Sequence, residues 1–519
     1  MEKIIKELIP QNANPKNFGN LITYEVSSSD ILSVCKDLYF KHKLHLKTIT
    51  AIDEGHNNYK ILYVFGVPKE NIFLIPYIKL SNTTEFPSLA NDIHETSGYE
   101  RKIQTFFGLL PQGHVNPRPI ILHKNWPEDQ FPLRKDFKWN DRPKEASNTY
   151  EFTKVEGEGI YEIPVGPVHA GIIEPGHFRF SVAGEEIVLL EPKLGYTHKG
   201  TEKLFETLPL EKKIKLSERV SGDSSFSHSL AFCQALESLA DVNIPQKAKW
   251  LRVIFAELER LANHFGDIGF IMLDTGYSFG GLSGQRLREM IMQWNEMLTG
   301  SRFLRGVNTI GGVTKDILPD FKTKLLKDLE KIEIDFTEIM KIANSSSSLL
   351  NRLEDTGTLD PRIARDHGVI GVARRAIGVK TDARIDYSYA AYDKIQLEIA
   401  TEETGDVNAR FKVRIKEVYS SIKILVEALE KLVDDEELFS SQNTSLKKDA
   451  YAIGIVEGWR GDIVYFIATD RNGNITRVDV RDPSFLNWTV LGYTGKGNVV
   501  PDFPLINKSF NLSYSGNDL

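Results

Sequence analysis

The sequence predicts an α+β amino-terminal domain followed by a larger, mostly α-helical domain. Three observations support this prediction: β-rich runs within residues 1–140, a polar stretch over 141–159, and long apolar stripes at helical spacing later in the chain. With 519 residues, 41% of them hydrophobic, the chain has enough apolar material for more than one core. We therefore expect domains at 1–140 and 160–519, with 141–159 as the linker.

Four runs in the first domain have the composition of β-strands. They are LITYEV (21–26), LKTITAI (46–52), YKILYVFGV (59–67) and NIFLIPYIKL (71–80), rich in β-branched and aromatic residues. Between the first two, residues 31–43 are expected to form a helix, with Asp30 or a preceding serine as its N-cap. The polar residues from Lys138 to Gly159 are typical of a linker.

The second domain begins with a β-rich run over residues 161–195 and then changes to helical periodicity. Two apolar stripes recur at spacings of three and four, which favours packed core helices over a coiled coil. They consist of Leu251, Ile254, Phe255, Leu258, Leu261, Ala262 and Phe265, and of Phe411, Ile415, Val418, Ile422, Leu425, Leu429 and Leu432. The serine run at 345–348 predicts a kink or turn within a helical region.

Composition excludes several classes of function. The net charge of −7 argues against non-specific nucleic-acid binding, which needs a basic surface. The two cysteines, Cys35 and Cys233, are too few for a disulfide framework, a four-thiolate zinc site or an iron–sulfur cluster. No stretch approaches the ~20 apolar residues that span a bilayer, and the first residues lack a signal-peptide pattern. A soluble, cytoplasmic chain that docks onto membrane partners is compatible with this composition.

Three segments combine residues suited to chemistry. GPVHAGIIEPGHFRF (166–180) contains His169, Glu174 and His177, which are either metal ligands, acid–base groups or members of a hydrogen-bonded loop. ERVSGDSSFSHSLAFCQALE (218–237) contains Asp223 and His228 at an expected helix start. VEGWRGDIVYF (456–466) and RDPSFLNW (481–488) form the third. No glycine-rich phosphate loop opens a helix after a strand, so NAD is not expected on this chain.

The order of these segments resembles one family. Together with PKLGYTHKGTEKLFE, LERLANHFGDIG, LTGSRFLRGVNTIGGV and DARIDYSYAAYD, they are similar to the large subunit of membrane-bound, group 4 (formate-hydrogenlyase-type) [NiFe] hydrogenases and to the D subunit of complex I. Residues 86–137, FPSLANDIHETSGYERKIQ through FPLRKDF, resemble the C subunit of complex I. The resemblance implies a C-subunit-like α+β domain fused to a helical D-subunit-like domain with a small antiparallel sheet near its start.

The residues that would hold a nickel–iron centre are replaced. In the resembling hydrogenases four cysteine thiolates from two CxxC pairs bind the metals, because soft bridging donors stabilise both ions. The matching positions here are Ser221, Ser224, Ser484 and Asn487. Serine hydroxyls do not replace bridging thiolates, so the resemblance predicts a member without a nickel–iron centre, not an active [NiFe] hydrogenase.

The quinone-binding residues of complex I are also incomplete. Gly222 stands where a quinone-contacting tyrosine is found in complex I, and the first loop has the longer hydrogenase form. His169 matches the first histidine of that loop, whereas the second falls near Glu174 or Pro175 without a counterpart.

The remaining matches give each residue two interpretations. Glu174 matches a proton-relaying glutamate, or it caps or pairs locally. Arg460 matches an arginine above the metal site, where it would hold an anionic or carbonyl ligand, or else it forms a buried ion pair with Asp482 or Glu457. Asp223 has no counterpart in the cavity of the resembling proteins. Its carboxylate is expected to interact favourably with the dipole of the helix that follows.

Three further matches are weaker. His228 matches a histidine near the interface with the small subunit, where it either tunes a cluster or packs. Arg384 and Asp386 are expected to form a structural pair. Glu202 matches a glutamate that joins a buried metal site in the family, but its histidine partner is absent, and no role is predicted for it.

Two functions follow from the resemblance. The first is an electron-transfer, quinone-reactive subunit of a membrane-bound, proton-translocating oxidoreductase. This chain would bind no cofactor itself, and a [4Fe-4S] cluster would lie in a partner small subunit. Membrane subunits would translocate ions. The chain would be a peripheral subunit on the cytoplasmic side of the membrane. The second is a catalytically silent scaffold that bridges the iron–sulfur subunit and the membrane arm. In complex I NADH binds another subunit.

Overall fold

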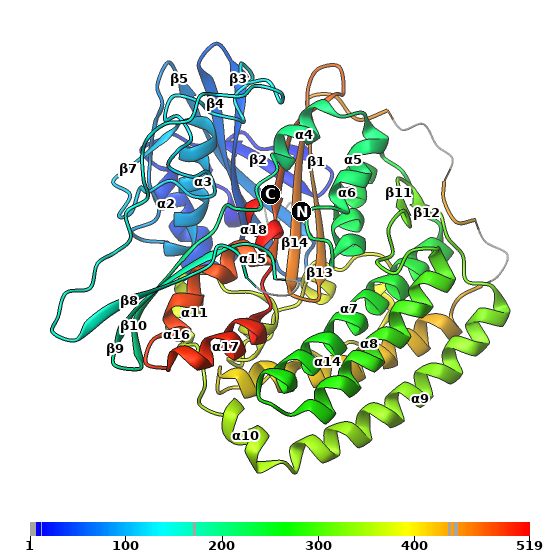
Figure 1. Cartoon of the computed structure of the whole chain (residues 1–519). Coiled ribbons are helices and arrows are strands. Elements are labelled where there is room, and N and C mark those ends of the chain that lie inside the picture. Colours follow the sequence, from blue (N-terminus) through cyan, green and yellow to red (C-terminus); the bar gives the residue numbers. More distant parts are fainter. Residues whose placement is uncertain (1–6, 12, 170–172, 434–436, 441–444) are drawn as a thin grey trace.

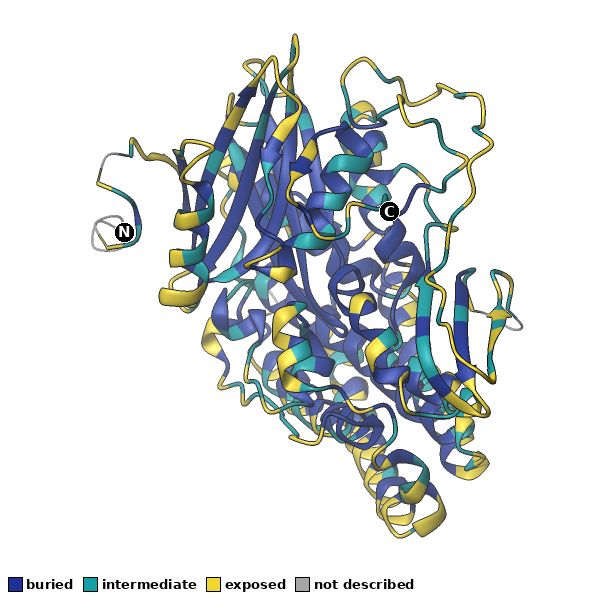
Figure 2. Cartoon of the chain, turned by 90° about the vertical axis from the view of Figure 1, so that its left-hand side faces the viewer, coloured by how far each residue is buried: buried dark blue, intermediate teal, exposed yellow. Residues whose placement is uncertain are grey.

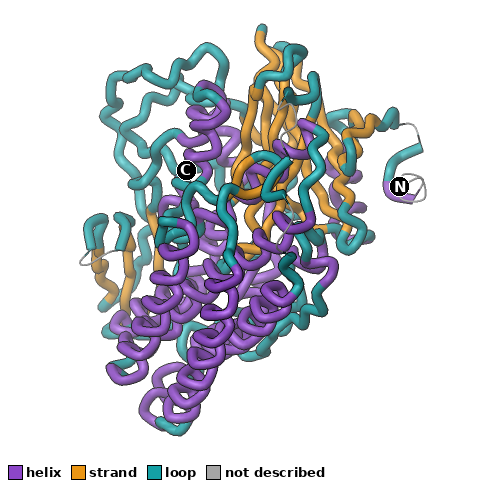
Figure 3. The backbone as a smooth tube through the Cα atoms, turned by 90° about the vertical axis from the view of Figure 1, so that its right-hand side faces the viewer, coloured by secondary structure: helices purple, strands orange, loops and turns teal. Residues whose placement is uncertain are grey.

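The computed structural model of the chain describes residues 7–11, 13–169, 173–433, 437–440 and 445–519. Part of the predicted loop over 166–180, residues 170–172, therefore lies outside the described residues. Figure 1 shows the β-rich amino-terminal part beside long helices, and Figure 3 shows most strands gathered in the upper part of the molecule and the long helices in the lower part.

The amino-terminal part is built on one five-stranded sheet. Its order is β1 (Lys16–Phe18), β2 (Leu21–Glu25), β5 (Ile72–Ser81), β4 (Asn58–Val67) and β3 (His45–Gly55). β2 and β5 run parallel and the other neighbours antiparallel. The four predicted strands are confirmed. So is the predicted helix, as α2 (Ile31–Lys36) and a π-helical turn (Asp37–Lys41), although the Asp30 carboxylate accepts a hydrogen bond from Ser27 and does not cap the helix.

Strand β4 shows why this sheet is apolar on both faces. Ile61, Tyr63 and Phe65 pack into a core with α2 and α3 (Ser97–Phe107). The alternate residues Leu62 and Val64 join a second core that includes residues of β13 (Tyr451–Gly458) and β14 (Gly461–Thr469). Because successive side chains of a strand point to opposite faces, a continuous apolar run implies cover on both sides. Figure 2 shows these strands as buried along most of their length.

The large domain opens with the expected antiparallel sheet, β8 (Ile160–Val165), β9 (His177–Ala183) and β10 (Glu186–Lys193). A bundle of four long helices follows: α7 (Gln246–Asp274), α8 (Ser278–Thr299), α9 (Pro319–Asn344) and α14 (Val407–Glu430). The first predicted stripe is wholly buried on α7. The second is buried on and just after α14, with only Ile415 partly exposed. Both therefore pack the core as predicted.

Shorter elements complete the domain. They are α4 (Thr201–Thr207), α5 (Leu210–Ser217), α6 (Ser225–Ala240), β11 (Asn308–Thr309), β12 (Gly312–Val313), α10 (Ser347–Leu353), α11 (Pro361–Asp366), α12 (Gly371–Arg375), α13 (Ala383–Asp386), β15 (Ile475–Arg481), α15 (Pro483–Asn487), α16 (Leu491–Gly495), α17 (Phe503–Phe510) and α18 (Tyr514–Asp518). In the amino-terminal part, β6 (Glu85–Pro87) and β7 (Leu110–Gln112) pair in parallel. The antiparallel sheet β13–β14–β15 was not predicted.

Two local predictions concern breaks in regular structure. The serine run separates α9 from α10, and the Ser346 hydroxyl caps α10 by accepting a hydrogen bond from the Leu349 amide, as the predicted turn requires. Residues 141–159 contain no helix or strand, as expected for a linker.

Within the described ranges, no helix has both the length and the apolar composition of a membrane span.

Helix α6 lies directly on β13, and Gly454 makes that close approach possible. A Cβ atom at residue 454 would lie 1.8 Å from the carbonyl oxygen of Ala231 and 3.1 Å from the amide nitrogen of Ala235. A side chain there must push the helix off the sheet. Since α6 begins at the candidate site, this glycine also sets the position of that site.

We expect Gly454→Ala to lower the free energy of unfolding by about 2 kcal/mol, as overpacking does in cores. The measurement is chemical denaturation of the full chain. Gly157→Ala is the matched control. Gly157 lies in the exposed linker, and a Cβ atom there meets only the side chain of Ile160. Equal stability of the two variants would contradict the close approach.

Candidate functional site

Three distant segments meet at the start of α6. Ser221 and Ser224 lie in the turn before this helix, Arg460 in the turn between β13 and β14, and Ser484 in the first turn of α15. A fourth segment, the one that leads into α18, brings Ser513 between them. The segments 218–237, 456–466 and 481–488, which stood out separately in the sequence, therefore lie together in the fold.

Arg460 and Asp223 form the central ion pair of the site. The guanidinium donates from Nη1 and Nη2 to the two carboxylate oxygens, both at 2.7 Å, and from Nε to the carbonyl of Asn511. Burial alone would raise the pKa of Asp223, but the Arg460 guanidinium holds that pKa below its ordinary value. The expected partner for Arg460, Asp482 or Glu457, was wrong. Asp223 is fixed by this pair, and not only by the dipole of α6.

A row of hydroxyl groups leads away from this pair. Ser221 donates to the Asp223 carboxylate at 3.0 Å, and the hydroxyls of Ser221 and Ser513 lie 2.8 Å apart. The Ser513 and Ser515 hydroxyls make a longer contact of 3.4 Å. If Ser221 donates to Asp223, the same sense of donation runs along the whole row from Ser515 to the carboxylate.

Glu174 stands beside the far end of this row. Its carboxylate accepts a hydrogen bond of 3.0 Å from the backbone amide of Ser515. The Asp223 end is open to solvent, because 34% of that side chain is exposed while Arg460 is almost fully buried. The row thus joins a partly exposed carboxylate to the neighbourhood of a second one.

The four replaced cysteine positions do not fit a nickel–iron centre. Ser221, Ser224 and Ser484 supply hydroxyl groups that are already engaged: Arg460 Nη1 lies 3.4 Å from both Ser221 and Ser224, and Ser484 accepts from the Ser513 amide at 2.9 Å. Asn487 bonds the backbone of Ile370 through both its amide oxygen and its amide nitrogen, at 3.0 and 3.1 Å. Neutral hydroxyl and amide donors held by the protein offer no bridging thiolate to these metals.

The other predicted site residues lie apart from one another. His169 is near the first loop, where Nε2 lies 2.7 Å from the Gly176 carbonyl. His177 Nδ1 lies 3.3 Å from the Gly166 carbonyl. The two histidines thus bond within the loop, as the hydrogen-bonded interpretation predicted, whereas Glu174 bonds the Ser515 amide outside it. Among the described residues, no group of three His, Cys, Asp or Glu side chains is arranged to hold a metal. Gly222 is exposed at the turn, with Arg305 as its near neighbour.

His228 is fully buried and bonded on both ring nitrogens. Nδ1 lies 3.0 Å from the Tyr465 hydroxyl, and Nε2 lies 3.0 Å from the carboxylate of Asp482. Asp482 in turn caps α15 through the amide of Ser484. This agrees with the packing interpretation of His228, since the ring connects α6 to the start of α15.

Two weaker expectations are resolved by the contacts. Arg384 pairs with Asp382 at 2.7 Å and with Glu257 at 3.0 Å, so the expected pair with Asp386 was wrong. Glu202 is held by Lys102 and Arg477 at 2.9 and 3.2 Å, a structural link between α3, α4 and β15.

The sequence analysis missed the carboxy-terminal part of the site. Asn511, Ser513 and Ser515 lie in a polar segment without a chemical motif, and only their contacts give them a role. The alternation of small polar residues in NLSYSGND (511–518) was the one available signal.

Comparisons with known proteins agree with this architecture. Residues 274–454 and 441–518 match the family described as the respiratory-chain NADH dehydrogenase 49 kDa subunit, and residues 24–143 match the 30 kDa subunit of the same complex. Formate hydrogenlyase subunit 5 of Escherichia coli is 32% identical over 506 residues, which cover 96% of this chain and 89% of that protein. The chain belongs to the fused complex I-type 30 kDa and 49 kDa subunit family.

Other members of the complex I-type family show the same fusion. Hydrogenase-4 component G of Escherichia coli is 33% identical over 96% of this chain and 88% of its own length. The fused C/D subunit of the NADH-quinone oxidoreductase of Phocaeicola vulgatus is 26% identical over 82% of this chain and 86% of its own length. The family resemblance inferred from the motifs is confirmed, including the order of the two parts.

Proposed function

We propose that this chain is an electron-transfer subunit of a membrane-bound, complex I-like oxidoreductase that works without a nickel–iron centre. The names of its relatives, which are parts of formate hydrogenlyase, hydrogenase-4 and NADH-quinone oxidoreductase, support the role of a subunit in an oxidoreductase complex. Its partners in this proposal are a small subunit with a [4Fe-4S] cluster and membrane subunits that translocate protons. The chain itself lies on the cytoplasmic side and binds no metal.

The observation that carries the proposal is the row of hydroxyls from Ser515 through Ser513 and Ser221 to Asp223. Reduction of a quinone to a quinol consumes two electrons and two protons. The partner's cluster would supply the electrons, and the hydroxyl row would supply protons from the side of Glu174. Arg460 orients Asp223 and keeps it ionised. Negative charge on the reduced quinone would raise the pKa of Asp223, which would then take the Ser221 proton and pass it to the quinone oxygen. Water on the Glu174 side would return a proton to the row at the Ser515 hydroxyl.

A silent scaffold remains the second candidate, and one observation favours it. The hydroxyls satisfy one another, and Asp223 occupies both outer nitrogens of the Arg460 fork. A ligand that needs this arginine must therefore displace the carboxylate. In a scaffold, the same contacts would only hold the four segments together.

We expect the native complex, purified from membranes with its partners, to contain no nickel and to contain iron in the amount of the partner's clusters. The ligand positions explain the first result, because thiolates are absent from all four. Elemental analysis by mass spectrometry measures both metals. Stoichiometric nickel would contradict the proposal, and an intact complex without iron would favour the scaffold.

A further inference from the structure

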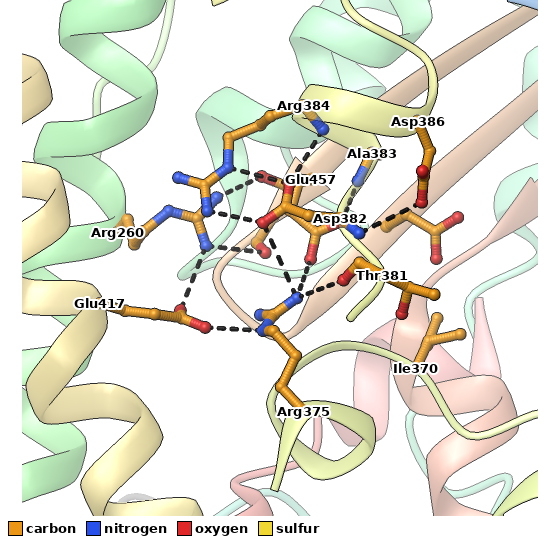
Figure 4. A network of polar contacts seen from close by, with 12 residues as sticks. Arg260, Ile370, Arg375, Thr381, Asp382, Ala383, Arg384, Asp386, Glu417 and Glu457 are labelled. Atoms are coloured by element: carbon orange, nitrogen blue, oxygen red, sulfur yellow. Dashed lines mark hydrogen bonds and ion pairs between the residues drawn. The ribbon is translucent and has the colours of Figure 1, made fainter. Parts of the chain in front are cut away.

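A second group of charged residues lies behind the candidate site, buried between α7, α14 and β13. Figure 4 shows Arg260, Arg375 and Arg384 interleaved with acidic side chains. The four carboxylates of this cluster belong to Glu257, Asp382, Glu417 and Glu457, and all seven side chains are buried.

The ion pairs of the cluster form a continuous network. Arg375 bonds Glu417 at 2.7 Å and Glu457 at 2.8 Å, and lies 3.9 Å from Asp382. Arg384 bonds Asp382 and Glu257, and Arg260 reaches Glu257 at 3.3 Å and Glu417 at 3.7 Å. Because the pairs share members, a charge added at one residue acts on all of them.

The charges of the network do not balance. Three arginines face four carboxylates, and the one histidine in contact, His264, is fully buried at 2.7 Å from Glu417. Burial lowers the pKa of His264, so the ring does not supply the missing positive charge at neutral pH. An uncompensated buried charge is costly, and one bound proton would bring the network to neutrality.

Glu457 is the member best placed to bind that proton. Its Oε1 accepts from Arg375 and its Oε2 from the Ala383 amide at 2.9 Å, while Glu257 and Glu417 each bond two or more cationic or hydroxyl groups. Burial, and then the neighbouring Asp382 carboxylate, raise the pKa of Glu457 to about 7. Burial alone would also raise the pKa of Asp382, but Arg384 holds that pKa below its ordinary value.

The network opens to solvent on one side. A cleft of about 860 Å³ lies between the amino-terminal part, at residues 39–47 and 90–95, and the large domain, at residues 365–387. Asp382, Asp386 and Glu457 line it. On its other side the network borders the candidate site, because the His264 ring meets the edge of Trp459, whose indole donates to the Asp223 carbonyl.

We propose that the Asp382–Glu457 carboxylate pair is a proton-binding site, which takes one proton from water in the cleft and holds it next to the candidate electron-transfer site. The proton adds to a Glu457 oxygen, and Asp382 keeps its charge and its pair with Arg384. The inference goes beyond the proposed function and does not depend on a quinone.

The charged and titratable groups that face Glu457 come from every element packed around it. They are Glu257, Arg260 and His264 of α7, Arg375 of α12, Asp382, Arg384 and Asp386 at α13, Tyr389 after it, Glu417 of α14 and Asp462 of β14. Lys47 and Arg481 neutralise Asp462 at 2.8 and 3.1 Å, and Arg384 pairs with Asp382 at 2.7 Å. Of the charged neighbours, Asp382 acts most strongly on the pKa of Glu457.

The test is infrared spectroscopy of the folded full chain between about pH 5 and about pH 9, with Glu457→Gln as the reference. We expect the wild-type chain to show the carbonyl stretch of one protonated carboxyl group that is absent from the variant. This band should disappear reversibly with a midpoint near pH 7, the pKa to which burial and Asp382 raise Glu457. Other carboxyls with a pKa near 7, such as those of Glu100 and Glu259, cancel in the difference.

Asp382→Asn keeps the test decisive if Glu457→Gln does not fold. Loss of the like charge should move the midpoint of the same band at least about one pH unit lower. A difference spectrum without a protonated carboxyl at any pH, or a midpoint that does not move in Asp382→Asn, would overturn the proposal.

Discussion

Replacing Arg375 with alanine is expected to lower the free energy of unfolding by about 3–5 kcal/mol, the cost of leaving buried charges without a partner. Arg375 is fully buried and bonds Glu417, Glu457 and the carbonyl of Thr381. Without it, four carboxylates face only two arginines. Chemical denaturation of the full chain measures the loss.

The same variant should show a characteristic pH dependence. Removal of the cation raises the pKa of the carboxyl groups in the folded chain above their unfolded values, so their stabilising contribution is present at low pH and lost as the pH rises. The difference in the free energy of unfolding between the wild type and Arg375→Ala should therefore grow from about pH 5 to about pH 8. Arg362→Ala is the control, because its pair with Asp360 is exposed at the surface, where an ion pair adds little to the free energy of unfolding. Similar losses in both variants would contradict the role of burial.

In the proposed quinone-reducing role, replacing Ser221 with alanine is expected to lower the turnover of the native complex by about 10²-fold, the lower range for removal of a proton-transfer group. The change interrupts the hydroxyl row between Ser513 and Asp223 and leaves the Arg460–Asp223 pair in place. Since proton delivery then limits the rate, the solvent isotope effect should increase.

The matched control for this prediction is Ser229→Ala. Ser229 is an equally buried hydroxyl of α6, but it contacts Phe226 and Asn308 and no member of the row. Its turnover should stay near that of the wild type. If the Ser221→Ala complex contains its iron and keeps normal turnover, the hydroxyl row does not deliver protons. The scaffold function would then be the better explanation.

The parts of the fold that the sequence predicted depend on local composition and periodicity. Strand β4 was predicted from its run of β-branched and aromatic residues, and helix α7 from apolar residues at helical spacing. Strands β13 and β14 were missed because they are apolar at most positions, so that no alternation distinguishes a strand from a helix segment. In β15 the charged residues Arg477, Asp479 and Arg481 are buried in ion pairs, so they do not mark a solvent-facing side of the strand.

The candidate site was predictable only in part, for a related reason. The motifs located Ser221, Arg460 and Ser484, but not what they contact. Asp223 and Arg460 are 237 residues apart, and which of several nearby carboxylates would bind the arginine depends on how the turn before α6 meets the turn after β13. Glu457 and Asp482, the sequence-near alternatives, are instead held by Arg375 and His228.

The Arg460–Asp223 pair would oppose the building of a thiolate metal site at this place. Cysteine at the four positions would set four thiolates around a carboxylate that already neutralises the arginine. The additional negative charge would oppose their ionisation, while Arg460 would have no free face to offset it. A variant designed to bind metal through thiolates at these positions would therefore also need a change at residue 223, which would free the Arg460 guanidinium to offset the thiolate charge.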